Sequence, residues 1–365
     1  MMKVVIDNIT YTGQRIGGIS CVFYELSKRL LKDERFEALF VEREDAMGNF
    51  YRKMLEIPAK QIIRNALAGW HYMIDRYVNP KLGIKEPYIF HSSYYRTSRD
   101  KNAINVTTVH DFTYERTSYR GWKGKIHIWQ QRKAVMDSDI VVCISENTKR
   151  DLLHFYKGVD ASKVHVVYNG VSDDYFPIED MSKIELLFER NSYAVFVGGR
   201  GGYKNFDISV KAAAAARLKM VIVGGQLGEE EKAFVDSTLG EGNYVCMSRV
   251  PNDRLNELYN GAFCLLYPSA YEGFGIPCVE AQRAGCPVIA YNASSIPEVM
   301  ADKEMMINEP TAEACMPIIN RLCDEAYRNR IIANGITFAN QFSWDRCYKQ
   351  YAKLYEEAMK ECYKC

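Results

Sequence analysis

Short apolar runs alternate with stretches of helical periodicity along the whole chain. Nearly every position in these runs is aliphatic or aromatic, which is typical of strands buried on both faces. The runs lie at 4–7, 38–41, 104–109, 140–144 and 164–168, and again at 194–197, 220–223, 244–247, 263–267 and 288–291. Amphipathic stretches, such as 22–31, 207–217 and 254–259, stand between them. The pattern predicts an α/β fold with parallel sheets.

The series of strands is interrupted between 168 and 191. Asn169-Gly170 is a turn signal, and 173–177 has the composition of a linker. Because the chain has 365 residues, we expect two doubly wound, Rossmann-like domains that face a central cleft. The predicted boundaries are 1–170 for the first domain, 171–340 for the second, and 341–365 for a last helix with Ser343 as its N-cap.

Composition places the chain among globular proteins, with 47% hydrophobic and 25% charged residues. It has no run of eighteen apolar residues, and a lysine near its start argues against a signal peptide. The eleven cysteines are scattered, and several lie in apolar runs, which indicates free thiols and a cytoplasmic location. Cys362 and Cys365 have CxxC spacing but no second pair to complete a zinc site.

The net charge of +1 hides an asymmetry between the two halves. Residues 1–170 contain 27 Lys and Arg against 19 Asp and Glu, whereas the rest contains 20 against 27. A basic first domain could meet an acidic acceptor, or an anionic membrane through peripheral contact on the inner face. We do not expect nucleic acid, because no recognition motif accompanies the charge.

Two segments rich in aromatic and basic residues leave their role open. Segment 51–95 contains Trp70, and segment 120–133 contains Trp122 and Trp129. Each is predicted to be an amphipathic helix packed on a sheet, with contact to an acceptor or a membrane surface as the alternative.

Glycines follow several predicted strands. The run 13–20, with Gly17 and Gly18, can bring backbone close to a ligand or form a simple turn, and the residues favour neither. It is not the dinucleotide fingerprint GxGxxG, which argues against a nicotinamide dehydrogenase. Gly224 and Gly225 are interpreted as a structural turn.

His110 and Asp111 end the predicted strand at 104–109. The histidine could hydrogen-bond a sugar hydroxyl, since polar residues at this edge carry the chemistry of α/β sheets. The alternative is a packed histidine beside an aspartate that caps a helix.

The run 198–205 contains four glycines with Arg200, Lys204 and Asn205. A guanidinium fork and an ammonium group at one strand end predict a clamp for a diphosphate that uses no metal. A solvated loop is the alternative. Asp137-Ser138-Asp139 has the spacing of a metal-binding pair, but it precedes a strand and is interpreted as a helix end.

Glu272 and Glu280 flank the sequence Gly273-Phe274-Gly275-Ile276-Pro277. Pro277 suits the first turn of a helix, and the preceding amides with the helix dipole can face an anion. Carboxylates can accept hydrogen bonds from sugar hydroxyls. Taken singly, each glutamate has a structural explanation, as a helix-start charge or a loop charge.

These residues together resemble the Glu-x7-Glu signature of the family 4 retaining glycosyltransferases. The resemblance extends over nearly the whole chain in the right order, through these segments: 142–148, 167–171, Arg200 with Lys204-Asn205, 285–290 and 342–344. It implies the GT-B fold, with an acceptor-binding first domain, a donor-binding second domain, and a final helix that returns to the first.

The resemblance also implies roles for single residues. Catalytic roles fall on His110 and Glu272 at the donor sugar and on Arg200 and Lys204 at the leaving diphosphate. Glu280 would bind the ribose, and Arg249 and Val250 would hold the base through backbone groups. The remaining donor-binding positions are Gly17, Gly18, Asn205, Gly273, Phe274 and Gly275.

We therefore expect a metal-independent, retaining hexosyltransferase without a cofactor. It would move a sugar from a UDP- or GDP-linked donor to a glycan or lipid-linked acceptor, in surface polysaccharide biosynthesis. The alternatives are a nucleotide-sugar epimerase or phosphorylase of the same fold, and a non-catalytic glycan-binding protein.

Overall fold

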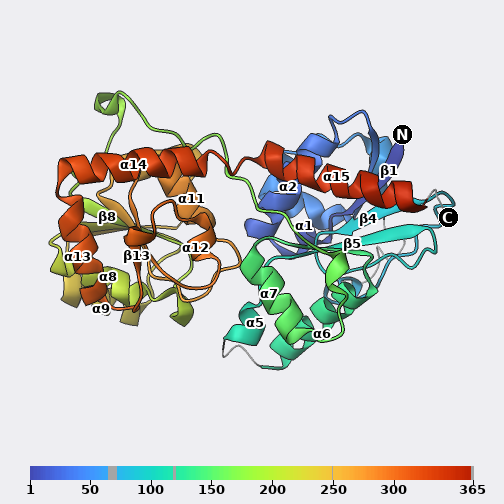
Figure 1. Ribbon diagram of the computed structural model, residues 1–365, viewed down its shortest axis with the longest axis horizontal. Coiled ribbons are helices and arrows are strands. Elements are labelled where there is room, and N and C mark those ends of the chain that lie inside the picture. The colour runs from blue at the N-terminus through green and yellow to red at the C-terminus, as the bar shows by residue number, and fades with distance from the viewer. Residues whose placement is uncertain (65–71, 118–120, 249, 363–365) are drawn as a thin grey trace. The chain divides into compact units, whose positions relative to one another are not determined.

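The computed structural model describes residues 1–64, 72–117, 121–248 and 250–362. The chain forms two compact units (Figure 1). Unit 1 consists of Met1–Gly170 together with Trp344–Cys365, and unit 2 consists of Val171–Ser343. The chain passes from one unit to the other at Gly170, directly after the Asn-Gly turn, and again after Ser343.

Unit 1 is built on a parallel sheet of seven strands in the order β3-β2-β1-β4-β5-β6-β7. The strands are β1 (Met2–Asp7), β2 (Phe36–Glu42), β3 (Ile62–Arg64), β4 (Tyr88–Ser92), β5 (Ala103–Val109), β6 (Ile140–Cys143) and β7 (Val164–Val166). Its helices are α1 (Ile9–Gly13), α2 (Gly18–Leu30), α3 (Phe50–Lys53), α4 (Tyr72–Asp75), α5 (Thr113–Arg116), α6 (Trp122–Asp137), α7 (Glu146–Phe155) and α15 (Trp344–Cys362).

Both faces of this sheet are buried, which explains why its strands are apolar at successive positions. On β1, Val4 and Ile6 join a core with residues of α2 and α15. Val5, between them in sequence, joins a separate core with residues of β2 and β4. The two faces therefore receive alternate side chains of the same strand.

The last helix, α15, completes the core of unit 1. Tyr351 and Tyr355 are buried in the same core as Val4 and Ile6 of β1. The hydroxyl of Tyr355 lies 2.6 Å from Nδ1 of His91, and Nε2 of His91 lies 2.8 Å from the hydroxyl oxygen of Thr108. Because burial disfavours the charged imidazolium, the pKa of His91 is lowered to about 3.

Unit 2 has a parallel sheet of six strands in the order β10-β9-β8-β11-β12-β13. Its strands are β8 (Tyr193–Val197), β9 (Lys219–Val223), β10 (Tyr244–Met247), β11 (Cys264–Tyr267), β12 (Val288–Tyr291) and β13 (Met306–Ile307). Its helices are α8 (Phe206–Ala215), α9 (Glu229–Leu239), α10 (Asn252–Gly261), α11 (Ile276–Arg283), α12 (Ile296–Val299), α13 (Ala312–Leu322) and α14 (Glu325–Ala339).

The expected architecture of two Rossmann-like parallel sheets is confirmed, but the prediction for segment 51–95 was wrong. In place of one amphipathic helix, its described residues form the short helices α3 and α4 and the strands β3 and β4. Trp70 lies outside the described residues. Segment 120–133 does form a helix, since α6 begins at Trp122, and α6 ends at Asp137 as expected.

Strand β13 was also missed, since only two of its residues pair with β12. Within the described ranges, no helix combines the length and the apolar character needed to cross a bilayer.

Candidate functional site

The predicted residues of unit 2 lie on loops that leave the carboxyl ends of neighbouring strands. Because the strands are parallel, the loops after β8, β9, β11 and β12 emerge at one edge of the sheet. β8 pairs with β9 on one side and with β11 on the other, so the strand order reverses between β8 and β11. Ligands of doubly wound sheets bind at this kind of position.

Lys204 and Glu272 meet at this point of reversal. Lys204 comes from the loop after β8 and Glu272 from the loop after β11, and they form an ion pair through Oε1 of the glutamate. The hydroxyl of Tyr267, the last residue of β11, donates to the same oxygen at 2.7 Å. Oε2 has no partner among the described residues, and both side chains of the ion pair are largely buried. The pair therefore combines a cation with a carboxylate that has one oxygen available.

Backbone contacts hold the two loops in register. The amide of Ala270 donates to the carbonyl of Tyr203 at 2.8 Å, and the side chain of Asn205 donates to the carbonyl of Pro268 at 2.8 Å. Asn205 has a φ of 51°, which lets it end one turn and begin α8. Asn205 thus acts here through the backbone of the loop that carries Glu272.

Two serines after β12 fix the backbone of Glu272. The amide of Glu272 donates to the hydroxyl of Ser294 at 2.9 Å, and the hydroxyl of Ser295 donates to the carbonyl of Glu272 at 2.9 Å. The position of the carboxylate is therefore determined by three loops, those after β8, β11 and β12.

Helix α11 begins directly after the turn that contains Gly273 and Phe274. Gly275 precedes the helix with a φ of 100°, a left-handed conformation that favours glycine. A Cβ at this position would lie 2.8 Å from Cδ1 of Ile296. Pro277 stands in the first turn as expected. The turn thus brings the positive end of a helix to the edge that holds Lys204.

Arg200 does not join the Lys204–Glu272 pair. Its guanidinium donates to the carbonyls of Gly224, Gly225 and Gln226 at 3.1, 3.2 and 2.6 Å. Its Nε donates to Glu231 at 3.1 Å. Arg200 therefore holds the loop after β9, and its expected contact with a diphosphate stays a prediction.

In the turn after β9, the backbone conformation and the close packing both require glycine at position 224. Gly224 has a φ of 152°, and a Cβ on it would lie 1.9 Å from the carbonyl oxygen of Gly198. The loops after β8 and β9 thus touch through their backbones, which agrees with the structural role expected for Gly224.

Glu280 lies on α11, in a half-buried position beside Tyr175 and Tyr259. Burial raises the pKa of this carboxyl group to about 7, although the two hydroxyl groups act in the opposite direction. Near neutral pH, the carboxyl group of Glu280 is therefore partly protonated and partly ionised. A ligand that donates hydrogen bonds to it favours the ionised form.

In unit 1, His110 follows the carboxyl end of β5 and is buried. Its Nε2 has no hydrogen-bond partner in the described chain, and burial lowers its pKa to about 4. The imidazole is consequently neutral at pH 7 and suited to a hydrogen bond with a ligand. Asp111 accepts from the amide of Thr113, the first residue of α5, at 2.9 Å, but the N-cap position of this helix is Phe112 and carries no side-chain capping bond, so the alternative of a helix-capping Asp111 is not confirmed.

Gly17 and Gly18 lie where α2 begins. Gly17 precedes the helix, and a Cβ on it would lie 2.5 Å from Oε1 of Gln14. Gly18 is the first residue of α2 and has open space around the position of a Cβ. The Gln14 amide is the end of a flexible side chain and Gly17 has an extended φ of 177°, so neither glycine is required by local packing, and Gly18 leaves the start of the helix accessible.

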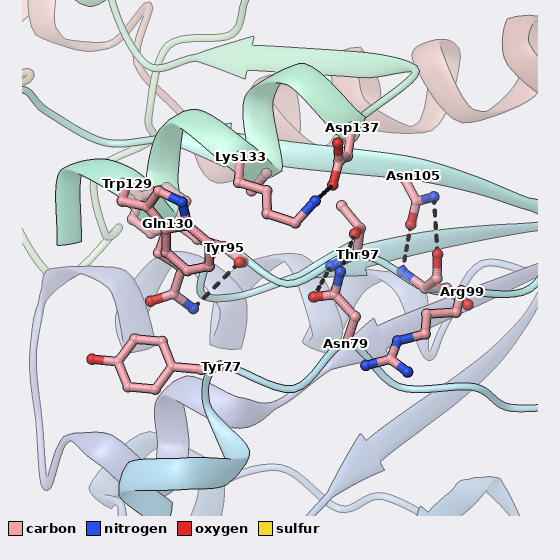
Figure 2. A pocket seen from close by; sticks show the side chains of 12 residues that line it. Tyr77, Asn79, Tyr95, Thr97, Arg99, Asn105, Trp129, Gln130, Lys133 and Asp137 are labelled. Carbon is pink, nitrogen blue, oxygen red and sulfur yellow. Dashed lines mark hydrogen bonds and ion pairs between the residues drawn. The ribbon is translucent and has the colours of Figure 1, made fainter. Parts of the chain in front are cut away.

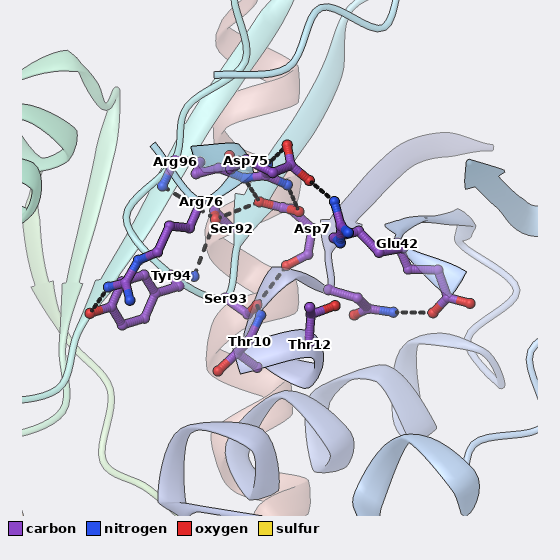
Figure 3. Close-up of polar contacts among 12 residues, drawn as sticks. Asp7, Thr10, Thr12, Glu42, Asp75, Arg76, Ser92, Ser93, Tyr94 and Arg96 are labelled. Atoms are coloured by element: carbon purple, nitrogen blue, oxygen red, sulfur yellow. Dashed lines mark hydrogen bonds and ion pairs between the residues drawn. The ribbon is translucent and has the colours of Figure 1, made fainter. Parts of the chain in front are cut away.

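A buried network of charges supports the same edge of unit 1 (Figure 3). Arg96 donates to Asp7, the last residue of β1, at 2.5 and 2.8 Å, and to Asp75 on α4 at 3.2 Å. Ser92 at the end of β4 donates to Asp7 at 2.8 Å. Since all these side chains are buried, removing one partner would leave an uncompensated charge. The network fixes the ends of β1 and β4.

The predicted residues fall into groups. In unit 2, Lys204 and Glu272 are in contact, and Asn205 and the turn at Gly273–Gly275 adjoin them. Val250 is half-buried before α10, and Arg249 lies outside the described residues. In unit 1, His110, Gly17 and Gly18 lie near carboxyl ends of strands.

Several residues of the site escaped prediction from the sequence. Tyr267 could have been found, because it ends a predicted strand just before Glu272. Ser294, Ser295 and Tyr175 carry no motif, and only the fold brings them to the two glutamates. Among the residues that the structure describes, no group of three or more His, Cys, Asp or Glu side chains is arranged to hold a metal ion.

Two family profiles match the chain, one in each half. The profile described as Glycosyltransferase Family 4 matches residues 16–175, and the profile described as Glycosyl transferases group 1 matches residues 177–338. Together they cover both predicted domains.

Proteins of known name are similar over most of the chain. O-antigen chain mannosyltransferase B of Escherichia coli is 26% identical over 287 residues, which are 74% of each protein. D-inositol 3-phosphate glycosyltransferase of Acidothermus cellulolyticus is 27% identical over 63% of this chain and 57% of that protein.

Two solved structures share the fold. Sucrose-phosphate synthase of Thermosynechococcus elongatus aligns with a TM-score of 0.76 at 16% identity, over 99% of this chain and 100% of its own. Alr3699/HepE of Anabaena, in complex with UDP and glucose, aligns with a TM-score of 0.73 at 16% identity, over 98% and 100%.

Proposed function

The chain belongs to the glycosyltransferases of group 1 and family 4, with the GT-B fold, and on that basis we propose that unit 2 binds a nucleoside diphosphate sugar. We further propose a retaining transfer to a glycan or lipid-linked acceptor without a metal ion. The observation that carries the proposal is the Lys204–Glu272 pair at the reversal of strand order, beside the start of α11.

Lys204 suits the diphosphate of such a donor, and Glu272 suits its sugar. When the bond between C1 of the sugar and the phosphate oxygen breaks, negative charge develops on the leaving diphosphate. Lys204 and the amides at the start of α11 are fixed groups that stabilise this charge, more strongly in the transition state than in the ground state. A cation and a helix start supply here what a divalent cation supplies elsewhere.

The carboxylates suit the sugar and the ribose. Glu272 has one carboxylate oxygen without a partner among the described residues, which can accept from a hydroxyl of the donor sugar. Glu280 becomes a better acceptor once ionised, as ribose hydroxyls would require. The presence of UDP and glucose in the Anabaena structure, a protein of the same fold, supports a uridine or similar nucleotide as the donor.

The acceptor is proposed to bind to unit 1. This unit carries 32 Lys and Arg against 23 Asp and Glu, so it attracts acidic acceptors and anionic lipid headgroups. We propose peripheral contact with an anionic membrane when the acceptor is lipid-linked. The neutral imidazole of His110, whose Nε2 has no hydrogen-bond partner among the described residues, is proposed to bind a sugar hydroxyl.

A thermal-shift screen tests the donor proposal. The full chain is melted with UDP, GDP and ADP, and with their common sugars, in buffer that contains EDTA. A ligand at 100 times its dissociation constant raises the free energy of unfolding by about 2.7 kcal/mol. We expect one nucleotide series to raise the melting temperature, and Lys204→Ala to remove the effect. No shift with any nucleotide sugar would refute the donor site.

The proposal of a retaining transfer is tested by the anomeric configuration of the product. Incubation of the donor with an oligosaccharide acceptor, followed by proton NMR of the anomeric signals, should give a product with the configuration of the donor. Conversion of the donor without acceptor would indicate an epimerase, and a requirement for inorganic phosphate would indicate a phosphorylase.

A further inference from the structure

Unit 1 contains a cavity of about 560 Å³ that reaches the amino end of β5 (Figure 2). Its lining comes from the second half of α6, from the chain before β4, and from the segment between β4 and β5. Asn105, near the start of β5, lines it, whereas His110 follows the other end of that strand. At roughly 3.3 Å per residue, these two positions are roughly 17 Å apart. The Asn105 end of the cavity is therefore remote from His110, whereas Tyr95 lines the part that is nearer to Asp111.

The lining combines aromatic rings with planar amides. The indole of Trp129 is 58% exposed, and Tyr77 is 36% exposed. The amide of Gln130 also lines the cavity, as do the amide of Asn79 and the hydroxyl of Thr97, which are hydrogen-bonded to each other at 2.8 Å. Aromatic faces pack against the apolar C–H face of a sugar ring, and amides and hydroxyls pair with its hydroxyl groups.

Two polar groups of the cavity are not used by the described chain. Nε2 of Gln130 donates to the carbonyl of Arg76 at 2.7 Å, but its buried Oε1 has no partner. A buried acceptor without a partner is unfavourable, so a hydrogen bond from a ligand hydroxyl to this atom would be stabilising. The guanidinium of Arg99 is exposed and pairs with no described residue, whereas Lys133 is paired with Asp137 at 2.5 Å. Arg99 thus adds a donor at the rim.

The backbone of the cavity is strained at one point. Tyr95 has a φ of 42°, a left-handed conformation that is strained for an aromatic residue. Its carbonyl oxygen accepts from Nε2 of Gln130 at 3.4 Å. Strain of this kind persists where the surrounding structure enforces it, and here it turns the chain along the lining that Gln130 and Trp129 share.

We infer that this cavity is a secondary saccharide site, which holds one or two sugar units of the acceptor glycan away from its reacting end. This inference rests on the proposed function, because the glycan is the acceptor of that reaction. Trp129 would be the stacking platform, Gln130 the hydroxyl partner, and Arg99 a partner for a carboxylate on an acidic sugar. Such a site would retain a long acceptor between successive transfers.

Trp122 provides the matched control. It lies on the same exposed side of α6 as Trp129, seven residues earlier, and is 67% exposed, but it does not line the cavity. If this side of α6 served a membrane surface, both tryptophans would matter. If the cavity binds sugar, only Trp129 should matter.

The test is saturation-transfer NMR on the full chain without donor. The probes are methyl glycosides of glucose, galactose, mannose, N-acetylglucosamine and glucuronic acid, and disaccharides of these sugars. We expect transfer to at least one probe, a loss of about tenfold in affinity with Trp129→Ala, a smaller loss with Arg99→Ala, and no change with Trp122→Ala. Thermal melts confirm that each variant is folded.

Other outcomes would overturn the inference. These are no saturation transfer to any probe, equal transfer with Trp129→Ala, or equal loss of sedimentation with phosphatidylglycerol vesicles for Trp122→Ala and Trp129→Ala. Donor binding, measured by thermal shift on the same samples, separates the two proposals. A protein that binds donor but no saccharide refutes only the secondary site, and one that binds saccharide but no donor refutes only the proposed function.

Discussion

Nζ of Lys204 and Oε1 of Glu272 form an ion pair between two loops that are 68 residues apart in sequence. The loops leave strands β8 and β11, which are neighbours in the sheet, so the contact follows from the strand order rather than from local sequence. A third residue, Tyr267, donates to the same carboxylate oxygen. Three side chains are therefore coupled at the place where the donor is proposed to bind.

Replacing Lys204 by alanine should lower kcat by about 100-fold or more, because it removes a fixed charge from the leaving diphosphate. Glu272→Gln should also lower kcat, and the double variant should lose less than the sum of the two effects, since the residues contact each other. Steady-state kinetics of the four proteins measures this coupling. Lys211→Ala, at an exposed position of α8, is the control and should retain full activity. Additive effects would contradict the coupling.

Arg200 is expected to act first on stability. Arg200→Ala leaves three backbone carbonyls of the loop after β9 without their donor, so the free energy of unfolding should fall by about 1–3 kcal/mol. Denaturant unfolding measures the change, and the exposed Arg190→Ala is the control. If Arg200→Ala unfolds like the parent protein yet binds no nucleotide, the guanidinium contacts the diphosphate instead.

Donor affinity should depend on pH through Glu280. The pKa of this group is raised to about 7, and the ionised form is the one that accepts hydrogen bonds. The dissociation constant for the nucleotide should therefore rise as the pH falls from about 8 to 6. Calorimetric titrations across this range measure it. Glu280→Gln should bind more weakly but with little pH dependence, whereas the exposed Glu229→Gln should behave like the parent protein.

The raised pKa of Glu280 has the opposite effect on stability, because the free energy of unfolding falls as the pH rises. Between its unfolded value near 4.5 and its folded value near 7, the folded protein holds the proton more tightly than the unfolded chain does. Glu280 thus stabilises unit 2 at low pH, and this contribution is lost as the pH rises through about 7.

Unit 1 should respond to pH in the other direction. The pKa values of His91 and His110 are lowered to about 3 and 4, so between about 4 and 6.5 the unfolded chain binds more protons. The free energy of unfolding therefore rises with pH over this range and then levels off. His110→Gln should reduce the rise by an amount on the order of 3 kcal/mol. Calorimetry from pH 4.5 to 7.5 measures it, with the exposed His154→Gln as a control that should keep the full slope.

The architecture could be predicted from the sequence because most strands buried on both faces contain a run of successive apolar residues. β4 was missed because its apolar run, Tyr-Ile-Phe, is followed by His91 and Ser92, and two buried polar residues do not look like part of a core strand. They are tolerated because Tyr355, Thr108 and Asp7 satisfy them. Partners as distant as 264 residues leave no local pattern.

The candidate site was partly predictable for a related reason. Strand ends followed by glycine, lysine and glutamate identified Lys204 and Glu272, since chemistry at this edge follows from the fold. The direction of the Arg200 guanidinium was not predictable, because it depends on where the carbonyls of Gly224, Gly225 and Gln226 point. Charge and spacing identify which residues lie at the carboxyl edge of the sheet. They do not show which of these side chains are bonded to the protein's own backbone.

The return of α15 to unit 1 has a consequence for how the chain folds during synthesis. Unit 2 is continuous from Val171 to Ser343, so all of its strands have left the ribosome before α15 is made. The core of unit 1 lacks Tyr351 and Tyr355 until the last helix emerges, although its sheet is translated first. Domains generally fold in the order of synthesis, but here the second unit can be finished while the first still exposes the face that α15 covers, and chaperones would recognise that face.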